Sequence, residues 1–383
     1  MIFENAILGA GASGMLCACI LNNSHTAIIE TNESIAKKVK VSGGGKCNIT
    51  NKFMSHSHFL GDKDFIQKAL SKFNEKDLLE LLKNSGINVK LNPKIVKGTF
   101  FCNSSSEVLE YFAKNSTKCK KFFNTKVLDL EFESGVYSIQ TSRGLIQSKN
   151  LIVASGGLSY QTLGSSDIGF NIAKKFNHPI KPLNPALVGF TVQKDQFWFK
   201  ELSGLSLDVK ISVKDKCIEG SLLFAHKGIS GPAVLSSSLY WDKGSLSIDF
   251  MPKVNITKLL HARQNISNAL PLPKRFITSF LNAVSLEDKQ LNTLSKDEIE
   301  RLSSIHDYRF APAGNFGYTK AEVTKGGVDT DYIDENMQST LQKGLYFIGE
   351  VLDVTGELGG YNIQWAFTSA YICAKHLKEN SRK

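Results

Sequence analysis

The chain has 383 residues, of which 42% are hydrophobic and 21% charged, and its formal net charge is +10. This composition excludes a wholly disordered chain, and the length allows two or three domains. No apolar run reaches the roughly 18 residues that a membrane helix needs, and the glycine-rich N-terminus without a basic leader predicts no secretory signal. The seven cysteines contain no CxxC pair. A disulfide scaffold and a zinc ribbon are therefore excluded, no bound metal is expected, and a cytoplasmic location is predicted.

The chain opens with the pattern of a strand, a glycine turn, a helix and a second strand. Residues 6–8 and 27–30 are short apolar strands, and residues 15–21 between them are helical in pattern. The intervening GxGxxG turn, Gly9–Gly14, allows close approach of the backbone to a pyrophosphate at a helix N-terminus. Glu30 can accept hydrogen bonds from ribose hydroxyls and would repel a 2′-phosphate. These features predict a site for an adenosine diphosphate group.

A three-stranded antiparallel meander is predicted between residues 122 and 154, where apolar and polar residues alternate. Simple NAD dehydrogenases continue instead with parallel βαβ units. Far downstream, residues 344–350 form a buried strand that ends in Gly349 and Glu350, followed by a helix over about 363–379. Glu350 can bind ribityl hydroxyls, and the helix can direct its N-terminus at a flavin ring. The arrangement therefore favours FAD.

We expect an α/β fold in which an FAD-binding Rossmann-like domain is interrupted by an insert. The FAD-binding domain comprises residues 1–185 and 311–383, and it contains one amphipathic helix over 64–85. Residues 186–254 contain short alternating strands and predict a β-rich insert domain. Residues 255–310 are polar and helix-like, and they predict a helical insert subdomain.

Five sequence blocks resemble the BaiN/YhiN-like family of flavoproteins. SGGGKCNITN at 42–51 is similar to the family signature SGxGRCNxTN, and the glycine-rich block at 349–366 is equally specific. The other matches are GGLSY at 156–160, FAHKGISGPA at 224–233 and EVTKGGV at 322–328. The resemblance implies an FAD domain of glutathione-reductase-like topology, a small β-barrel insert, a helical insert, and an NAD(P)/FAD-dependent oxidoreductase activity.

The glycine turn and the resemblance together predict the cofactor-binding residues. They are Gly9, Gly11, Ala12, Ser13, Gly14, Glu30, Thr31, Lys38, Ser42, Gly43, Gly44, Lys46, Cys47, Asn48, Val127, Ala154, Gly156, Gly349, Glu350, Gly360, Tyr361, Asn362 and Ile363. Lys46 stands where the family has Arg, which removes a bidentate phosphate contact. Cys47 has no CxxxxC partner, so we expect a packed thiol and no disulfide-reductase mechanism.

The predicted function is FAD-dependent reduction of a small conjugated or carbonyl substrate. NADH or NADPH would supply hydride transiently, because the chain has no second GxGxxG motif. His226, in a glycine-flanked loop, is the predicted proton donor. Two alternatives remain: an FAD-dependent RNA-modifying enzyme, which the positive charge motivates, and a non-catalytic flavin redox sensor. The RNA alternative, less favoured here, requires a basic face with exposed aromatic residues near the flavin. No membrane partner is expected, and the oligomeric state is left open.

Overall fold

The computed structural model describes residues 1–92 and 96–381, which divide into two compact units. The first unit is built from Met1–Pro185 and Ala321–Lys383, and the second from Ala186–Lys320. Each unit has its own cluster of buried apolar side chains. The first unit is therefore assembled from two stretches of chain that the second unit separates.

A parallel sheet forms the centre of the first unit. Its strands, in spatial order, are β7 (Lys120–Phe122), β2 (Thr26–Ile29), β1 (Ile2–Leu8), β10 (Gly144–Val153) and β20 (Leu345–Phe347). β2 and β20 are entirely buried, as expected of parallel strands that are covered on both faces. The last strand comes from the C-terminal stretch, so this sheet joins the two parts of the unit.

The predicted antiparallel meander is present and merges with the parallel sheet. β8 (Val127–Glu133) pairs with β9 (Val136–Thr141), and β9 pairs with the first half of β10, from Gly144 to Ser148. The second half of β10 lies between β1 and β20. The long strand β10 thus carries the chain from the meander into the buried centre.

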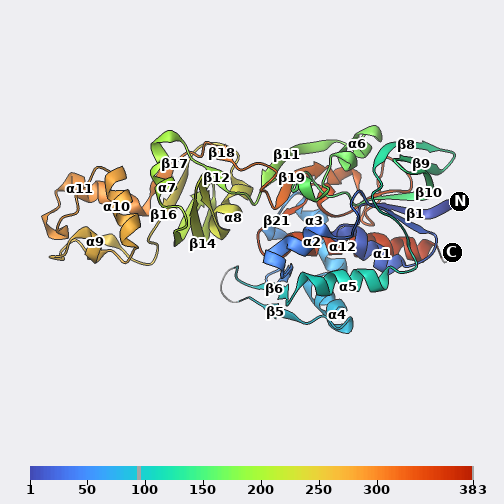
Figure 1. The fold of residues 1–383 in the computed structure, drawn as a ribbon, viewed down its shortest axis with the longest axis horizontal. Coiled ribbons are helices and arrows are strands. Elements are labelled where there is room, and N and C mark those ends of the chain that lie inside the picture. Colours follow the sequence, from blue (N-terminus) through green and yellow to red (C-terminus); the bar gives the residue numbers. More distant parts are fainter. Residues whose placement is uncertain (93–95, 382–383) are drawn as a thin grey trace. The chain divides into compact units, whose positions relative to one another are not determined.

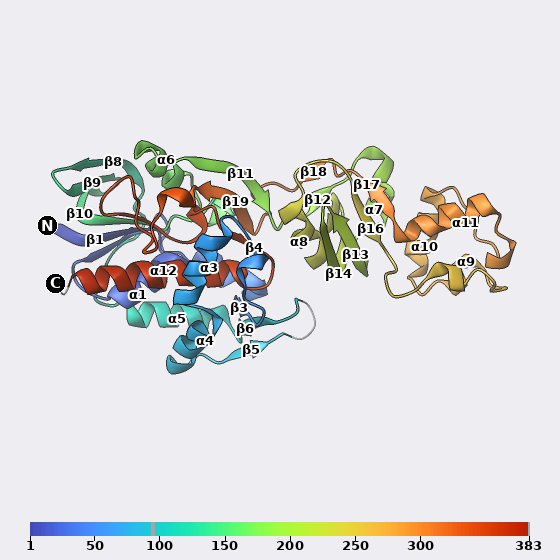
Figure 2. The same ribbon diagram turned by 180° about the vertical axis from the view of Figure 1, so that it is seen from behind.

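Two helices pack together against the parallel strands. They are α1 (Ala12–Leu21), which follows the glycine turn, and α12 (Tyr361–Asn380), the terminal helix. Figures 1 and 2 show α1, α12 and α5 (Ser105–Asn115) on one side of β1 and β10, with β8, β9 and α6 (Ile168–Lys175) on the other side. The N-termini of α1 and α12 therefore belong to neighbouring helices.

The single helix predicted over residues 64–85 is wrong, because the structure contains two helices there. α3 (Lys63–Lys72) ends at Phe73, whose backbone is extended, and α4 (Glu75–Asn84) begins after Asn74. The Asn74 side chain accepts a hydrogen bond from the Asp77 N–H at 3.3 Å, and the Asp77 carboxylate accepts one from the Asn74 N–H at 2.8 Å. This capping box starts a new helix.

Shorter elements of the first unit surround the glycine-rich loops. They are α2 (Lys37–Val41), the sheet of β3 (Asn48–Asn51), β6 (Thr99–Cys102) and β5 (Val89–Leu91), the pair of β4 (Phe59–Leu60) with β21 (Thr355–Gly356), and the pair of β11 (Ile180–Ala186) with β19 (Val323–Val328). β4 and β21 are antiparallel. This pair brings the segment after residue 52 to the loop that precedes α12.

The second unit contains an antiparallel sheet of seven strands. In spatial order they are β17 (Tyr308–Phe310), β16 (Leu246–Asp249), β13 (Ser206–Val213), β14 (Lys216–Ala225), β15 (Gly228–Ser230), β12 (Phe190–Thr191) and β18 (Gly314–Asn315). Its helices are α7 (Trp198–Glu201), α8 (Pro232–Tyr240), α9 (Ile266–Ala269), α10 (Lys274–Ala283) and α11 (Lys296–Ser303). Residues 311–320, which the sequence-based division assigned to the FAD-binding domain, belong here because β18 pairs with β12.

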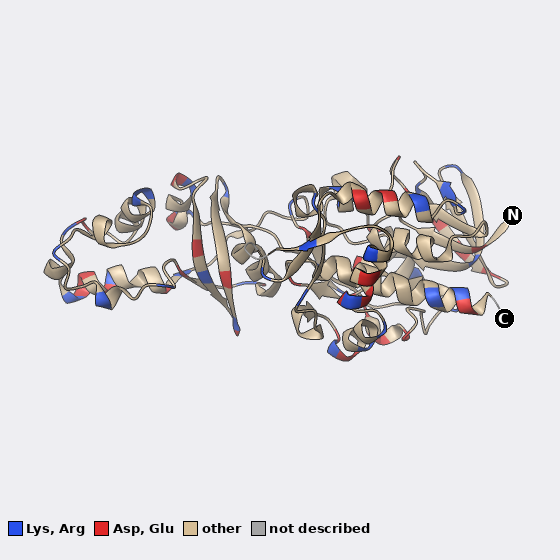
Figure 3. Cartoon of the chain, turned by 90° about the horizontal axis from the view of Figure 1, so that it is seen from below, with Lys and Arg blue, Asp and Glu red and all other residues tan. Residues whose placement is uncertain are grey.

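The strand-rich and helical parts of the second unit share one core. Phe250 after β16 and Phe276 of α10 have ring centroids 4.9 Å apart, and both rings are fully buried. Figure 3 shows basic and acidic residues scattered over both units. Among the described helices, none combines the length and the apolar character that a membrane span requires.

Candidate functional site

The glycine turn after β1 leaves the N-terminus of α1 open to a ligand. A Cβ on Gly14 would stand 1.9 Å from the Gly9 carbonyl oxygen, so the helix can pack this closely only with glycine there. Gly11 is different, because a Cβ on it would meet no atom within 4 Å. Gly11 caps α1 without a side-chain hydrogen bond, and the first turn, which includes Ala12 and Ser13, contains no acidic residue. The open backbone and the positive helix end fit a pyrophosphate.

Glu30 is held beside this turn by three donors. Its carboxylate accepts hydrogen bonds from the Ala10 N–H at 2.7 Å and from the N–H and the side-chain amide of Asn32, each at 2.8 Å. Glu30 is 9% exposed, whereas the following Thr31 is exposed. Asn32 also donates to the Leu163 carbonyl at 2.9 Å. Sequence reasoning missed Asn32, whose only signal is its place two residues after the acid.

Three other predicted residues lie at the same carboxyl edge of the sheet. The Thr125 N–H donates to the Glu30 carbonyl at 2.9 Å, and Val127 begins β8 directly beyond it. Ala154 follows β10, and its carbonyl oxygen lies 2.6 Å from where a Gly9 Cβ would stand. Gly156, two residues later, has a positive φ of 72°. Nucleotides bind at this edge in open α/β sheets.

The Gly349–Glu350 turn lies against the first motif. A Cβ on Gly349 would be 2.5 Å from the Ser13 hydroxyl oxygen, so the two motifs are in contact. Glu350 Oε2 lies 2.7 Å from Lys38 Nζ, and Glu350 Oε1 accepts the Thr324 N–H at 2.9 Å. Thr324 was not among the predicted residues. A carboxylate has about four lone-pair positions, so Glu350 retains capacity for the ribityl hydroxyls predicted for it.

The loop from Ser42 to Gly45 has the backbone that only glycine adopts readily. Gly43 and Gly44 have φ values of 57° and 65°, and Gly44 faces open space. A Cβ on Gly43 would lie 2.9 Å from Asn48 Oδ1. The Ser42 hydroxyl donates to the Val39 carbonyl at 2.8 Å and so fixes the loop to α2.

Cys47 and Lys46 have different surroundings. Cys47 is fully buried, and this burial raises the pKa of its thiol to about 11. The thiol is therefore neutral, as a packed residue would be, and not a nucleophile. Lys46 is exposed, and its ammonium nitrogen lies 5.5 Å from the centre of the Phe101 ring. This contact places the Lys46 ammonium beside a ring of β6.

The N-terminus of α12 is the second open helix end. Gly360, with φ of 96°, caps it without a side-chain hydrogen bond, and its first turn, with Ile363, contains no acidic residue. Asn362 accepts the Gly356 N–H and donates to the Gly356 carbonyl, both at 2.8 Å. Tyr361 is buried, which raises the pKa of its phenol and keeps it neutral. A positive helix end here fits the edge of a flavin that gains negative charge on reduction.

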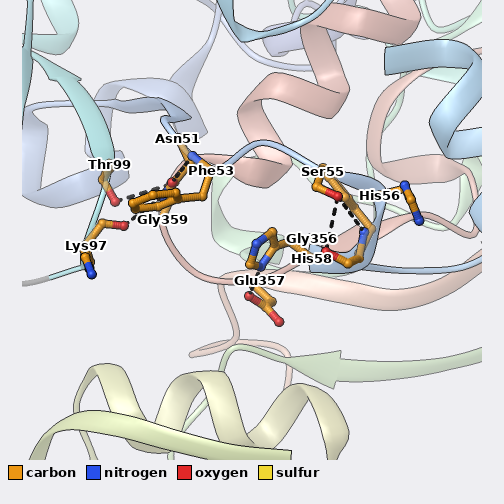
Figure 4. Close-up of polar contacts among 12 residues, drawn as sticks. Asn51, Phe53, Ser55, His56, His58, Lys97, Thr99, Gly356, Glu357 and Gly359 are labelled. Carbon is orange, nitrogen blue, oxygen red and sulfur yellow. Dashed lines mark hydrogen bonds and ion pairs between the residues drawn. The ribbon is translucent and has the colours of Figure 1, made fainter. Parts of the chain in front are cut away.

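A histidine–carboxylate pair lies beside this helix end. His58 Nδ1 is 2.7 Å from Glu357 Oε2 (Figure 4). The His58 ring also stacks on Tyr361, with ring centroids 4.8 Å apart. The Glu357 N–H also donates to the His58 carbonyl at 2.9 Å. The two residues are 299 positions apart, so no spacing in the sequence predicts the pair.

A basic surface with aromatic rings borders the same loop. We call Lys46, Lys52, Phe53, Lys90, Lys97 and Phe101 the basic sheet surface. Phe53 is 46% exposed with Lys97 Nζ 5.7 Å from its ring centre, and Lys90 is paired with Phe101 across β5 and β6. In the sequence, residues 34–61 and 85–106 contain no acidic residue. That absence is the sequence signal from which a basic surface could have been predicted.

Asn51 joins the basic sheet surface to the loop before α12. Its side-chain amide donates to the carbonyls of Lys97 at 3.2 Å and Gly359 at 3.0 Å, and its Oδ1 accepts the Phe53 N–H at 3.0 Å. Thr99 donates to the same Gly359 carbonyl at 3.3 Å. Figure 4 shows Asn51 and Thr99 converging on Gly359. The Phe53 backbone is thus connected through Asn51 to the segment that leads into α12.

His226, the predicted proton donor, belongs to the second unit. It lies in the exposed turn between β14 and β15 of the second unit. Its assignment as proton donor therefore stays a prediction. Within residues 1–92 and 96–381, no group of three or more His, Cys, Asp or Glu side chains is arranged to hold a metal ion.

The chain matches the family described as HI0933-like protein Rossmann domain over residues 3–376. It is 38% identical over 396 residues to the ribosomal RNA dihydrouridine synthase of Haemophilus influenzae, with 97% of each chain covered. It is 34% identical over 394 residues to the ribosomal RNA dihydrouridine synthase of Escherichia coli K12, with 98% of each chain covered. It is also 28% identical over 412 residues to the 3-dehydro-bile acid delta(4,6)-reductase of Clostridium scindens, covering 97% of this chain and 98% of that one.

Among solved structures, the 3-ketosteroid delta1-dehydrogenase from Sterolibacterium denitrificans is similar in fold. The TM-score is 0.52 at 12% identity, and the match covers 99% of this chain and 100% of that one. At this identity the likeness concerns the fold alone. Together with the family match it confirms the predicted α/β fold with an FAD-binding Rossmann-like domain.

Proposed function

The chain belongs to the HI0933-like Rossmann family, as its resemblance to BaiN/YhiN-like flavoproteins predicted, and from that membership we propose that it is an FAD-dependent enzyme that reduces uracil to dihydrouracil in ribosomal RNA. The observation that carries this proposal is the similarity, over 97–98% of the chain, to two enzymes named ribosomal RNA dihydrouridine synthase. The sequence alone favoured a small-molecule substrate over nucleic acid, whereas this proposal places RNA first.

The proposed reaction keeps one feature of the predicted substrate, a conjugated double bond, but not its small size. The C5–C6 double bond of uracil is conjugated with the C4 carbonyl, so its reduction adds a hydride to one carbon and a proton to the other. Bound FAD supplies the hydride chemistry, and NADH or NADPH is the proposed source of the electrons. The protein must then position the base and provide the proton.

The basic sheet surface supports an RNA substrate. Lysines on a groove or face bind phosphates, and exposed aromatic rings stack on bases that leave the duplex. Asn51 connects this surface to the loop before α12, where a flavin ring fits. An enzyme that acts on ribosomal RNA would be located in the cytoplasm, which is also the location predicted from the free cysteines.

A second candidate substrate is a free conjugated ketone. The 28% identical relative is named 3-dehydro-bile acid delta(4,6)-reductase. Its lower identity ranks this candidate behind RNA. The flavin site would be the same for both substrates, so only the acceptor distinguishes them.

Two half-reactions test the proposal. The purified protein is expected to contain FAD and not FMN, and NADH or NADPH should bleach the flavin absorbance in the absence of oxygen. In-vitro-transcribed ribosomal RNA, free uridine and a 3-oxo-Δ4 steroid are then each added to the reduced protein. The proposal is supported if the RNA reoxidises the flavin quickly and neither free uridine nor the steroid does. Reoxidation by the steroid alone would favour the second candidate, and reoxidation by none of the three would favour a redox sensor.

A further inference from the structure

His58, in the β4 region, is a titratable side chain that a carboxylate holds next to the N-terminus of α12. Two contacts orient its ring: the 2.7 Å contact from Nδ1 to Glu357 Oε2, and the stack on Tyr361. The surrounding backbone is also fixed. β4 pairs with β21, and the Asn362 side chain is hydrogen-bonded to both the N–H and the carbonyl of Gly356. The ring is therefore held at a defined position beside the helix end.

The contact with Glu357 determines which nitrogen carries a proton. An ionised carboxylate can only accept a hydrogen bond, so His58 Nδ1 must be the donor. Nε2, on the opposite side of the ring, has no partner among the described residues. The side chain is 33% exposed, so water can reach it. A histidine whose Nδ1–H is held by a carboxylate and whose Nε2 is free has the arrangement of a general acid or base.

We propose that His58 is the proton donor of the reductive reaction and that Glu357 is its positioning residue, an inference that rests on the proposed function. The imidazolium Nε2–H bond breaks, and the proton joins the electron pair released from the substrate double bond to form one C–H bond. The hydride, with its two electrons, forms the other C–H bond and comes from the reduced cofactor. His58 is left neutral with its Nδ1–H still on Glu357, and a proton from water restores the imidazolium.

The other candidate proton donors are less suitable than His58. Tyr361 is buried and neutral, with its pKa raised, and its ring serves as the surface on which His58 stacks. The Cys47 thiol is fully buried. His56, two residues before His58, points away from Glu357 in Figure 4, which makes it a matched control.

Four variants test the proposal: His58→Asn, His58→Ala, Glu357→Gln and, as control, His56→Ala. The Asn amide can still donate to Glu357, so His58→Asn preserves the loop but removes the transferable proton. We expect His58→Asn and His58→Ala to bind FAD and to be reduced by NADH or NADPH as the wild type is. Reoxidation by in-vitro-transcribed ribosomal RNA should slow about 10²-fold or more, and added imidazole should restore part of the rate in His58→Ala. Glu357→Gln should show a smaller loss, and His56→Ala none.

A measurement without turnover checks the location of His58. Diethyl pyrocarbonate acylates accessible histidine nitrogens, and peptide mass analysis can quantify each site. The RNA should protect His58 in the FAD-loaded protein but leave the exposed His25 reactive. Normal reoxidation of His58→Asn, or equal labelling of His58 with and without RNA, would overturn the proposal. If the wild type itself is not reoxidised by RNA, the proposed function fails instead, and the same variants are then measured with the steroid as acceptor.

Discussion

The Nζ atom of Lys38 lies 2.7 Å from Glu350 Oε2, although 312 residues separate the two side chains in sequence. Lys38 belongs to α2, and Glu350 follows β20 in the C-terminal stretch. This ion pair joins two motifs that the sequence could only predict separately. The two stretches of the first unit therefore fold as one site, and their coupling can be measured.

The first prediction concerns that ion pair. Lys38→Gln and Glu350→Gln, singly and together, form a double-mutant cycle on the unfolding of the protein without cofactor. The side chains are 33% and 21% exposed, so we expect a coupling free energy of about 0.5–1 kcal/mol. The same cycle on Lys149 and Glu4, an exposed pair, should give a smaller value. A coupling of zero for Lys38 and Glu350 would contradict the prediction that this ion pair stabilises the first unit.

The second prediction concerns FAD affinity. Glu30→Ala removes the predicted acceptor for ribose hydroxyls and leaves the Ala10 N–H without its partner. We expect the binding free energy of FAD to weaken by about 1–3 kcal/mol, as measured by the quenching of flavin fluorescence. Glu33→Ala, on the same loop but with a side chain that is 75% exposed, is the matched control and should bind FAD normally. Equal affinities for both variants would contradict the adenosine site.

The third prediction concerns RNA. Phe53→Ala removes an exposed stacking ring from the basic sheet surface and should weaken RNA binding by about 1–3 kcal/mol without changing FAD binding. Phe132→Ala, at an exposed aromatic residue of β8, is the control. Lys46→Ala and Lys90→Ala should each reduce the slope of log affinity against log salt by about 0.7–0.9. RNA affinity that is indifferent to all three changes would place the RNA interface elsewhere.

The fourth prediction concerns pH. His178 is 2% exposed, and removal from water lowers the pKa of its imidazole. The unfolded chain therefore gains a proton near pH 6.5 and the folded chain only at lower pH, so stability falls as the pH drops below about 6.5. The slope from one such group is at most about 1.4 kcal/mol per pH unit.

His178→Gln tests this dependence, because the Gln amide can still reach Ser339, which lies 2.8 Å from His178 Nε2. Thermal midpoints of wild type and variant at pH 7.5 and 5.5 give the comparison. The wild type should lose more stability on acidification than His178→Gln. His25→Gln, at an exposed histidine, should behave as the wild type does. Identical pH dependence of all three proteins would rule out the buried neutral histidine.

The sequence predicted the elements whose signals are local. The glycine turn, the position of Glu30 and the alternation in β8 each follow from neighbouring residues, and the structure contains the corresponding turn, strand end and meander. The capping box at Asn74 was equally local but was overlooked, which produced one helix in place of two. The sequence N-E-K-D at 74–77 is sufficient to predict that a helix begins after Asn74.

The contacts between distant segments could not be predicted in this way. The pair of His58 with Glu357, and the bonds from Asn51 to Gly359, depend on β4 meeting β21 and on β3 lying beside α12. No spacing of residues in the sequence predicts these contacts, because they result from packing around a shared core. For the same reason, β18 could not be assigned to the second unit before its pairing with β12 was known.

The most direct test of the account is nucleoside mass spectrometry on ribosomal RNA treated with this protein. In-vitro-transcribed ribosomal RNA, which contains uridine but no dihydrouridine, is incubated with the FAD-loaded protein and NADH or NADPH, then digested to nucleosides. We predict dihydrouridine, with two more hydrogens than uridine, in the wild-type reaction and about 10²-fold less or lower with His58→Asn. Absence of dihydrouridine from the wild-type reaction, while a 3-oxo-Δ4 steroid reoxidises the same flavin, would contradict the assignment to RNA.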